Sequence, residues 1–166
     1  MRPTLSNSFR RNNMKAKTIA ITISLVFVSV ALGFQDNPHM GTWKLNETKS
    51  KLAGKARNNT VTYEAAGDQI KVTVDGVDAS GGAVHHEWTG KFDGKDYAVT
   101  GDAGSDMRSY RMVNKHTLEI AGKKGGKETL TGRIVVSNDG KMRTVTTTST
   151  DSEGKKVTNV AVYDKQ

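Results

Sequence analysis

The histidines are the side chains best suited to chemistry, and their spacing argues against a metal site. His85 and His86 are adjacent, and adjacent side chains on a strand point to opposite faces, so this pair cannot chelate one ion. His39 and His116 have no metal-ligand spacing to any partner. We therefore predict no metal site. We interpret His86 as a hydrogen-bonded residue lining the interior, with ligand contact or catalysis as the alternatives.

Two carboxylates, Asp102 and Asp106, stand four residues apart in a glycine-rich loop and could suggest calcium. The loop lacks the ligand order and the closing Glu of a calcium-binding loop, and a turn built from Asx residues explains it equally well. Serines and histidines occur without a nucleophile elbow or an identifiable base partner. The absence of cysteine excludes disulfides, thiol catalysis and thiolate ligands. We expect no enzyme, no catalytic residue and no cofactor.

The elements that position these residues are predicted to be strands. After Gly41, segments rich in Val, Thr, Ile and aromatic residues alternate with turns of Gly and Asp, Asn or Ser, a pattern typical of an antiparallel sandwich or barrel. Period-two alternation, as in Ile70, Val72 and Val74, indicates one buried face on each strand. We predict ten strands, near residues 42–46, 59–65, 69–76, 83–92, 95–99, 106–112, 117–123, 127–136, 141–150 and 155–163.

Short strands in such number favour an all-β fold, an antiparallel up-and-down β-barrel of about 8–10 strands, because closure removes the exposed edges. The one helix candidate after the leader spans Asn46 to Ala53, where Asn46 could cap a turn or two before Gly54 ends it. The threonine-rich run from Arg143 to Thr150 is typical of a strand. If its even-numbered threonines point inward, that wall is polar and suits an amphipathic ligand; these are Thr144, Thr146 and Thr148.

Residues 1–33 have the layout of a signal peptide, with a basic n-region followed by an uncharged apolar stretch from Thr18 to Phe34. Small residues at Ala31 and Gly33 favour cleavage after Gly33, which leaves a linker at 34–40 and one β-barrel domain at 41–166. This predicts a periplasmic or secreted protein with a membrane-associated, helical leader before cleavage. The alternative is an inner-membrane anchor formed by residues 18–34. Met14 is a second candidate start.

The positive charge of the chain does not indicate nucleic-acid binding. The formal net charge is +8, but five of the 25 basic residues precede the apolar stretch, which leaves 20 against 17 acidic residues, a net charge of +3. The basic excess therefore belongs mostly to the leader, and we expect no nucleic acid among the partners.

Both ends of the predicted barrel resemble known families. The first strand carries Gly41-Thr42-Trp43, similar to the G-x-W that opens lipocalins and fatty-acid-binding proteins, and the last strand ends in Tyr163-Asp164-Lys165 in the fatty-acid-binding pattern. Taken whole, residues 40–165 resemble bacterial secreted lipocalin-like proteins of the calycin superfamily. The resemblance implies structural roles for Gly41 and Trp43, with the Trp packing across one end of the barrel.

The chain departs from the fatty-acid-binding pattern at the position of the carboxylate-binding arginine. That position, two residues before the final Tyr, is Ala161, and Tyr163 alone cannot neutralise a carboxylate. Arg108 or Arg111 could substitute, with Tyr110 facing the other way. The two-helix lid is also missing.

We expect the barrel to bind a small hydrophobic or amphipathic molecule non-covalently, and a cavity of about 300 Å³ or more is the condition for this. The alternative is a non-catalytic structural or interaction domain of the cell envelope with a filled barrel. The oligomeric state stays open. The resemblance and the alternating aromatic positions predict a cavity lined by Tyr63, His86, Trp88, Tyr110 and Tyr163.

Overall fold

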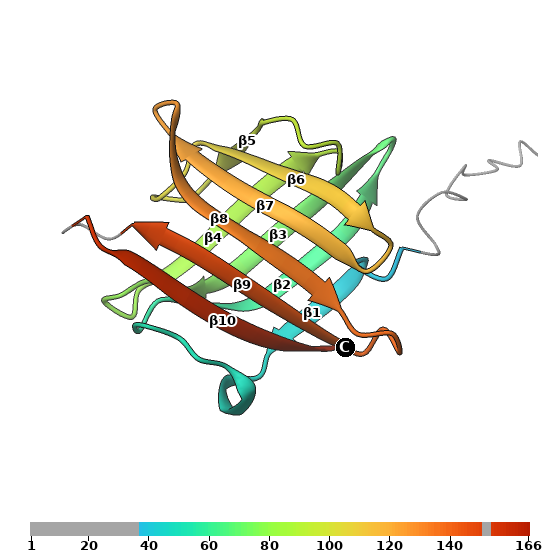
Figure 1. Cartoon of the computed structure of the whole chain (residues 1–166), viewed down its shortest axis with the longest axis horizontal. Helices are drawn as coiled ribbons and strands as arrows, with labels where there is room; N and C mark the ends of the chain where they lie inside the picture. The colour runs from blue at the N-terminus through green and yellow to red at the C-terminus, as the bar shows by residue number, and fades with distance from the viewer. Residues whose placement is uncertain (1–36, 151–153) are drawn as a thin grey trace, which may run out of the picture.

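The computed structural model describes residues 37–150 and 154–166, and in this part the chain folds into one closed antiparallel barrel (Figure 1). Neighbouring strands along the chain pair throughout, and β1 closes the ring by pairing with β10. The predicted leader lies outside the described residues. The strands are β1 (Gly41–Leu45), β2 (Arg57–Ala66), β3 (Gln69–Val77), β4 (Ala83–Gly90), β5 (Tyr97–Thr100), β6 (Met107–Asn114), β7 (Thr117–Lys124), β8 (Lys127–Val136), β9 (Met142–Thr150) and β10 (Lys156–Lys165).

The fold class predicted from the sequence is confirmed. Ten strands run up and down, and each predicted strand corresponds to one strand of the structure with ends that differ by a few residues. The turn between β7 and β8 shows why the hairpins are tight. Gly125 and Gly126 have φ of 55° and 78°, and a two-residue turn with both φ positive has the twist that flanking strands need.

The predicted helix after β1 is reduced to a single 3-10 turn, η1 (Glu47–Lys49). Asn46 caps it as expected, since its side chain accepts a hydrogen bond from the Lys49 amide at 3.2 Å. The turn ends early because Ser50 is extended and Lys51 forms an antiparallel bridge with Val160 of β10. Pairing of Lys51 with β10 therefore prevents the helix from extending beyond Lys49, and it adds to the contact between this segment and the barrel.

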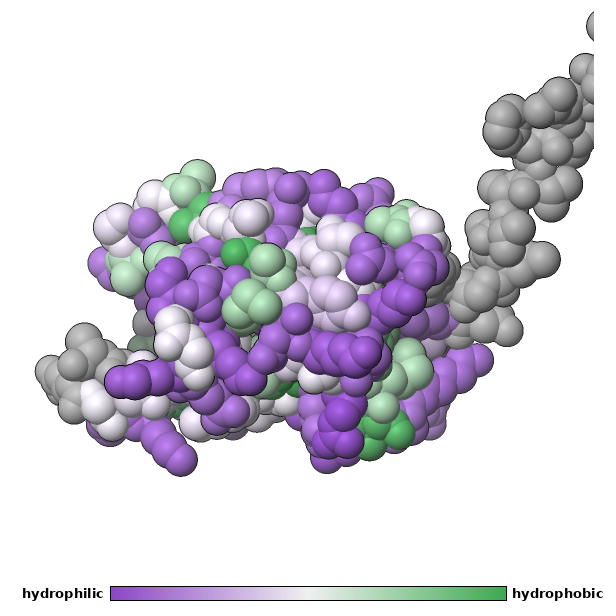
Figure 2. Space-filling view, turned by 90° about the horizontal axis from the view of Figure 1, so that it is seen from above, coloured by the Kyte–Doolittle hydropathy of each residue, from purple (hydrophilic) through white to green (hydrophobic). Residues whose placement is uncertain are grey.

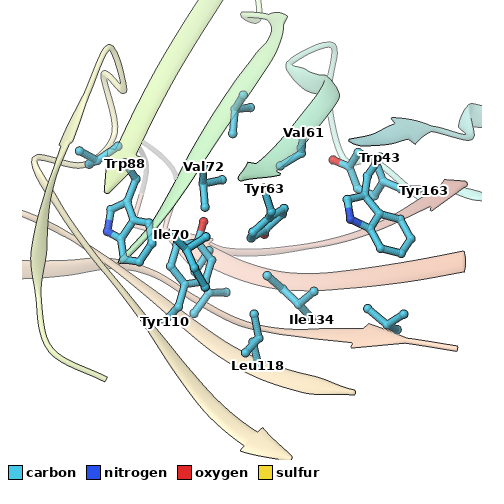
Figure 3. Packing of buried hydrophobic residues seen from close by; sticks show 14 residues of the cluster. Trp43, Val61, Tyr63, Ile70, Val72, Trp88, Tyr110, Leu118, Ile134 and Tyr163 are labelled. Carbon is cyan, nitrogen blue, oxygen red and sulfur yellow. The ribbon is translucent and has the colours of Figure 1, made fainter. Parts of the chain in front are cut away.

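One end of the barrel is filled by large side chains. Trp43 is fully buried, and its indole Nε1 donates to the carbonyl of His39 at 2.9 Å. Residues 37–40, predicted as part of a linker, pack at this end, where His39 is itself fully buried. Figure 3 shows Trp43 beside Tyr163 on one side of the packed cluster and Trp88 on the other. We call the end of the barrel that these side chains fill the closed end.

The even-numbered threonines of β9, considered above as inward-facing, point out of the barrel. Arg143, Val145 and Thr147 face the interior, so Thr144, Thr146 and Thr148 point outward. The reason is the register of β9, in which Arg143 lies opposite Tyr163 of β10 and Val136 of β8, both buried inside the barrel. Of these outward threonines, Thr148 contacts a threonine of β10, since the Thr148 and Thr158 hydroxyls lie 3.2 Å apart.

The outer surface is mainly hydrophilic, with small separate apolar areas (Figure 2). Within residues 37–150 and 154–166, the exposed large apolar side chains are Met112, Val113, Val135 and Met142. The part of the chain that the structure describes contains no helix with the length and apolarity of a bilayer-spanning segment.

Candidate functional site

A cavity of about 450 Å³ occupies the barrel interior and reaches the surface at the end opposite Trp43. We call this the open end. Loop residues there border the cavity and are exposed, among them Ala56 before β2, Asp78 after β3 and Ala103 after β5. The volume falls in the range of about 300–1,000 Å³ that is usual for small-molecule sites. The interior is therefore not filled by the chain's own side chains.

Aliphatic side chains form most of the cavity wall. Strand alternation sends Val61 and Val74 inward from β2 and β3, and Ile120 and Ile134 inward from β7 and β8. These four residues are at most 9% exposed. Val145 of β9 completes the apolar ring. This wall favours an apolar molecule or the apolar part of an amphipathic one.

Three tyrosines lie between this wall and the closed end. Tyr63, Tyr110 and Tyr163 line the cavity and are each at most 3% exposed. Burial raises the pKa of Tyr63 and of Tyr163, while the nearby positive charge of Arg143 acts in the opposite direction on both. A hydrogen bond with Tyr110 adds to the raised pKa of Tyr63. The Tyr63 and Tyr163 hydroxyls therefore stay protonated at neutral pH and can serve as hydrogen-bond donors.

Arg143 lies among the aromatic rings at the inner end of the cavity. Its guanidinium carbon is 4.7 Å from the ring centre of Tyr163 and 5.1 Å from those of Tyr63 and Trp43. The residue is 1% exposed, and its Nε and Nη1 atoms have no hydrogen-bond partner within the described residues. Cation–π contacts with three rings stabilise the buried charge but supply no counterion.

A second buried arginine lies nearer the open end, and this one is paired. Arg108 of β6 donates from Nη2 to Asp102 Oδ2 at 2.5 Å, and the two side chains are only 10% and 13% exposed. His86 of β4 lines the same region and is half-buried. Burial lowers its pKa, with the Asp102 carboxylate acting in the opposite direction. The open end thus carries a compensated ion pair beside a neutral imidazole.

Four of the five predicted lining residues border the cavity, namely Tyr63, His86, Tyr110 and Tyr163. Trp88 does not. It faces the interior as expected, but it packs between Tyr97 and Tyr110 at the closed end, with ring centres 5.7 and 4.7 Å away. Its indole Nε1 donates to the carbonyl of Arg108 at 2.9 Å. Trp88 therefore closes the barrel and does not line the cavity.

The orientation considered for the arginines of β6 needs a correction. Arg108 and Tyr110 are two residues apart and both line the cavity, so Tyr110 does not face away from Arg108. Arg111 points outward and pairs with Glu119 of β7. The adjacent histidines divide as predicted, since His86 faces the cavity and His85 is exposed, 2.7 Å from Asp75 Oδ1.

Arg143 is the site residue that sequence reasoning missed. Arg143 is the first residue of the threonine-rich run, and a charged residue at the end of a strand is usually exposed, so it was not singled out. One signal was present: Val145 is the only aliphatic residue between Thr144 and Thr150, and it marks the odd positions as the inward face. Arg143 shares that parity. Within the described residues, no group of three or more His, Cys, Asp or Glu side chains could hold a metal ion.

No family model matches the chain, and no curated protein matches it. Among solved structures, the chain is similar to the redesigned β-barrel mFAP1 bound to DFHBI, with 11% sequence identity and a TM-score of 0.45 over 78% of this chain and 97% of that one. A likeness at this level says nothing of what this chain binds. The resemblance of its first and last strands to lipocalin-like proteins stays a prediction.

Proposed function

We propose that this barrel binds a small hydrophobic or amphipathic molecule non-covalently, without catalysis. The observation that carries the proposal is the cavity of about 450 Å³, with aliphatic walls and a few polar groups at its ends. Sites for small molecules have this composition, mostly apolar with a small number of placed polar side chains. The alternative, a structural domain with a filled barrel, gives no account of this space.

The proposal is tested with N-phenyl-1-naphthylamine, a neutral dye that fluoresces in apolar surroundings. The wild-type domain is expected to bind it saturably at one dye per chain. Ala161 lines the cavity on β10, so Ala161→Trp fills the space and should abolish binding. Val135→Trp adds the same ring at a position that is 42% exposed on the outside of β8, and should leave binding unchanged.

Two results would contradict the proposal: no saturable binding by the wild-type domain, or equal binding by the Ala161→Trp variant. Far-UV circular dichroism checks that both variants fold. Ala161→Leu, a smaller filling change, should weaken dye binding without abolishing it, which keeps the test informative if the Trp variant is poorly folded.

The proposal includes export, with residues 1–33 as a cleaved leader and the periplasm or the medium as destination. It is supported by the basic residues ahead of the apolar stretch and by Ala31 and Gly33 at its end. Expression of the full chain should yield a mature protein whose first residue is Phe34 or Gln35. An intact N-terminus in the membrane fraction would favour the anchor instead.

A further inference from the structure

The two ends of the cavity offer a ligand different groups. At the inner end, the three lining tyrosines are each at most 3% exposed. Arg143 beside them is 1% exposed, and its Nε and Nη1 atoms are buried, so a ligand there meets little polar surface. Several polar residues of the lining lie towards the open end and are half-buried; among them are His86, Asp102, Thr147 and Asn159. The hydrogen-bonding groups that a ligand can reach are therefore concentrated at the open end.

These groups lie on two opposite sides of the cavity. His86 is on β4 and Thr147 is on β9, and five strand steps separate the two strands in either direction round the ring of ten. Asn159 lies opposite Thr147 in the register of β10 with β9. Asp102 and Arg108 lie on the other side, near His86, since the charges of both act on its pKa. A head group at the open end therefore has hydrogen-bonding partners on two sides.

The charges of this end balance, which decides against an ionic head group. The charged lining residues here are Arg57, Asp78, Asp102 and Arg108. Arg108 is paired with Asp102 at 2.5 Å, and Arg57 with Glu47 at 3.3 Å. Burial lowers the pKa of His86, so the imidazole is neutral at pH 7. An ion would have to compete with the existing pairs, whereas a neutral head can use the hydrogen-bonding capacity that remains.

We propose that the ligand is a neutral amphiphile that enters with its apolar chain first and holds a hydroxyl-bearing head at the open end, between His86 and Thr147. This inference rests on the proposed function and names the class of molecule. The apolar chain would lie along Val61, Ile134 and the other aliphatic wall residues. A neutral imidazole and a threonine hydroxyl each donate and accept hydrogen bonds, as the hydroxyls of the head do.

Two of the proposed partners are ready for such a head. The Asn159 Oδ1 atom accepts from the Ala53 amide at 2.7 Å, which fixes the side chain and leaves its NH2 group as the donor. Within residues 37–150 and 154–166, the His86 imidazole makes no hydrogen bond. Both can therefore bind a head group without giving up a contact that the folded domain uses.

The test compares four probes with the same ten-carbon chain on the folded domain: 1-decanoylglycerol, methyl decanoate, decanoate and decyltrimethylammonium. Each is measured by displacement of N-phenyl-1-naphthylamine at pH 7.5, below its micelle concentration. Methyl decanoate has the same ester without the glycerol hydroxyls. Decanoylglycerol is expected to bind about 5- to 50-fold more tightly than methyl decanoate, as for one or two further hydrogen bonds. It should also bind more tightly than either ion.

Each proposed partner has a matched control on the outer face of its own strand. His86→Leu and Thr147→Val remove hydrogen-bonding groups from the cavity, and in both variants decanoylglycerol should lose its advantage while methyl decanoate binds as before. His85→Leu and Thr146→Val make the same changes at exposed neighbouring positions and should alter neither affinity. Thr147→Val keeps the size of the side chain, so its result does not depend on repacking of the wall.

The orientation of the ligand is read from the wild-type domain, which makes the test independent of any variant. Isotope-filtered NMR of bound decanoylglycerol should show contacts from its glycerol protons to His86 and from its terminal methyl group to the rings of Tyr63 and Tyr163. Glycerol contacts to those tyrosines would place the head at the inner end and overturn the proposal.

The failures of the two proposals are distinguishable. Equal affinity for methyl decanoate and decanoylglycerol, with dye binding intact, would overturn the head site and leave the ligand-binding barrel standing. Tightest binding of decanoate or of decyltrimethylammonium would assign the ligand to an ionic class and overturn the neutral one. Absence of dye binding itself would count against the barrel's proposed function.

Discussion

Trp43 stabilises the folded barrel through its burial and through the groups that stack on its ring. It is fully buried, its indole donates to the His39 carbonyl, and Arg143 and Lys165 lie over its ring, each 5.1 Å from the centre. Trp43→Ala should lower the free energy of unfolding by about 3–5 kcal/mol, measured by urea denaturation. Trp43→Phe retains an aromatic ring and should cost clearly less. An unchanged midpoint for Trp43→Ala would show that the ring does not close the barrel.

His39 makes the stability of the domain depend on pH. Burial, reinforced by the positive charge of Arg143, lowers its pKa from 6.5 to about 4, and neither ring nitrogen has a hydrogen-bond partner among the residues that the structure describes. The unfolded chain takes up a proton as the pH falls through about 6.5, while the folded chain does not until about 4. Stability from His39 is therefore full above pH 6.5 and decreases by on the order of 3 kcal/mol towards pH 4.

Urea denaturation between pH 7.5 and 4.5 measures this slope, and His39→Gln should reduce it. A smaller slope of the same sign remains from His86, whose pKa burial also lowers. His85→Gln is the control, because hydrogen bonding to Asp75 raises the pKa of His85 and its contribution to stability therefore grows as the pH falls. This variant should lose stability more steeply than the wild type towards low pH. Equal slopes in wild type and His39→Gln would contradict the assignment.

The ion pair near the open end should matter more than an ion pair on the outside. Arg108 is only 8% exposed, and Asp102→Ala removes the acceptor of its guanidinium. The substitution should therefore lower the free energy of unfolding by about 2–3 kcal/mol. Glu119→Ala breaks the exposed pair with Arg111 and should cost less than about 1 kcal/mol. Both are read from urea midpoints. Similar losses for the two variants would contradict the burial argument.

At the scale of elements, a glycine of β8 permits close approach of β9. A Cβ at Gly132 would lie 2.4 Å from the Thr146 carbonyl oxygen and 3.0 Å from the Thr147 Cα, and backbone atoms of a paired strand cannot move aside freely. Gly132→Ala should lower the melting temperature, with a cost of about 1–3 kcal/mol. Gly54→Ala meets nothing within 4 Å and should be close to neutral. A neutral Gly132→Ala would contradict the close packing of the two strands.

Strands could be predicted from the sequence because alternation and turn glycines are local signals. The segment after β1 could not, because its fate depends on a partner: Lys51 bridges Val160, more than a hundred residues away, and this pairing ends the helix at Lys49. The inward face of β9 is similar. Threonine is compatible with either face, so the register with β8 and β10 decides which face Arg143 takes.

At the scale of the whole molecule, the sequence predicts which side chains point into the barrel but not which of them reach the cavity. Alternation correctly placed Tyr63, Tyr110, Tyr163 and Trp88 on inward faces, but it contains no information on height along the barrel axis. Trp88 lies at the closed end, where Phe92, Tyr97 and Tyr110 surround it, and so it is separated from the cavity. Which end is filled and which is open emerges only when ten strands close.

The central claim is that the ligand site lies inside the barrel, between the closed end and the open end. Backbone amide NMR of the domain titrated with N-phenyl-1-naphthylamine tests it directly. Shift changes are predicted at inward residues of several strands, including Tyr63, Ile120 and Val145, and in the loops of the open end. Changes confined to outward positions such as Val135 and Met142, or none at saturating dye, would contradict the account.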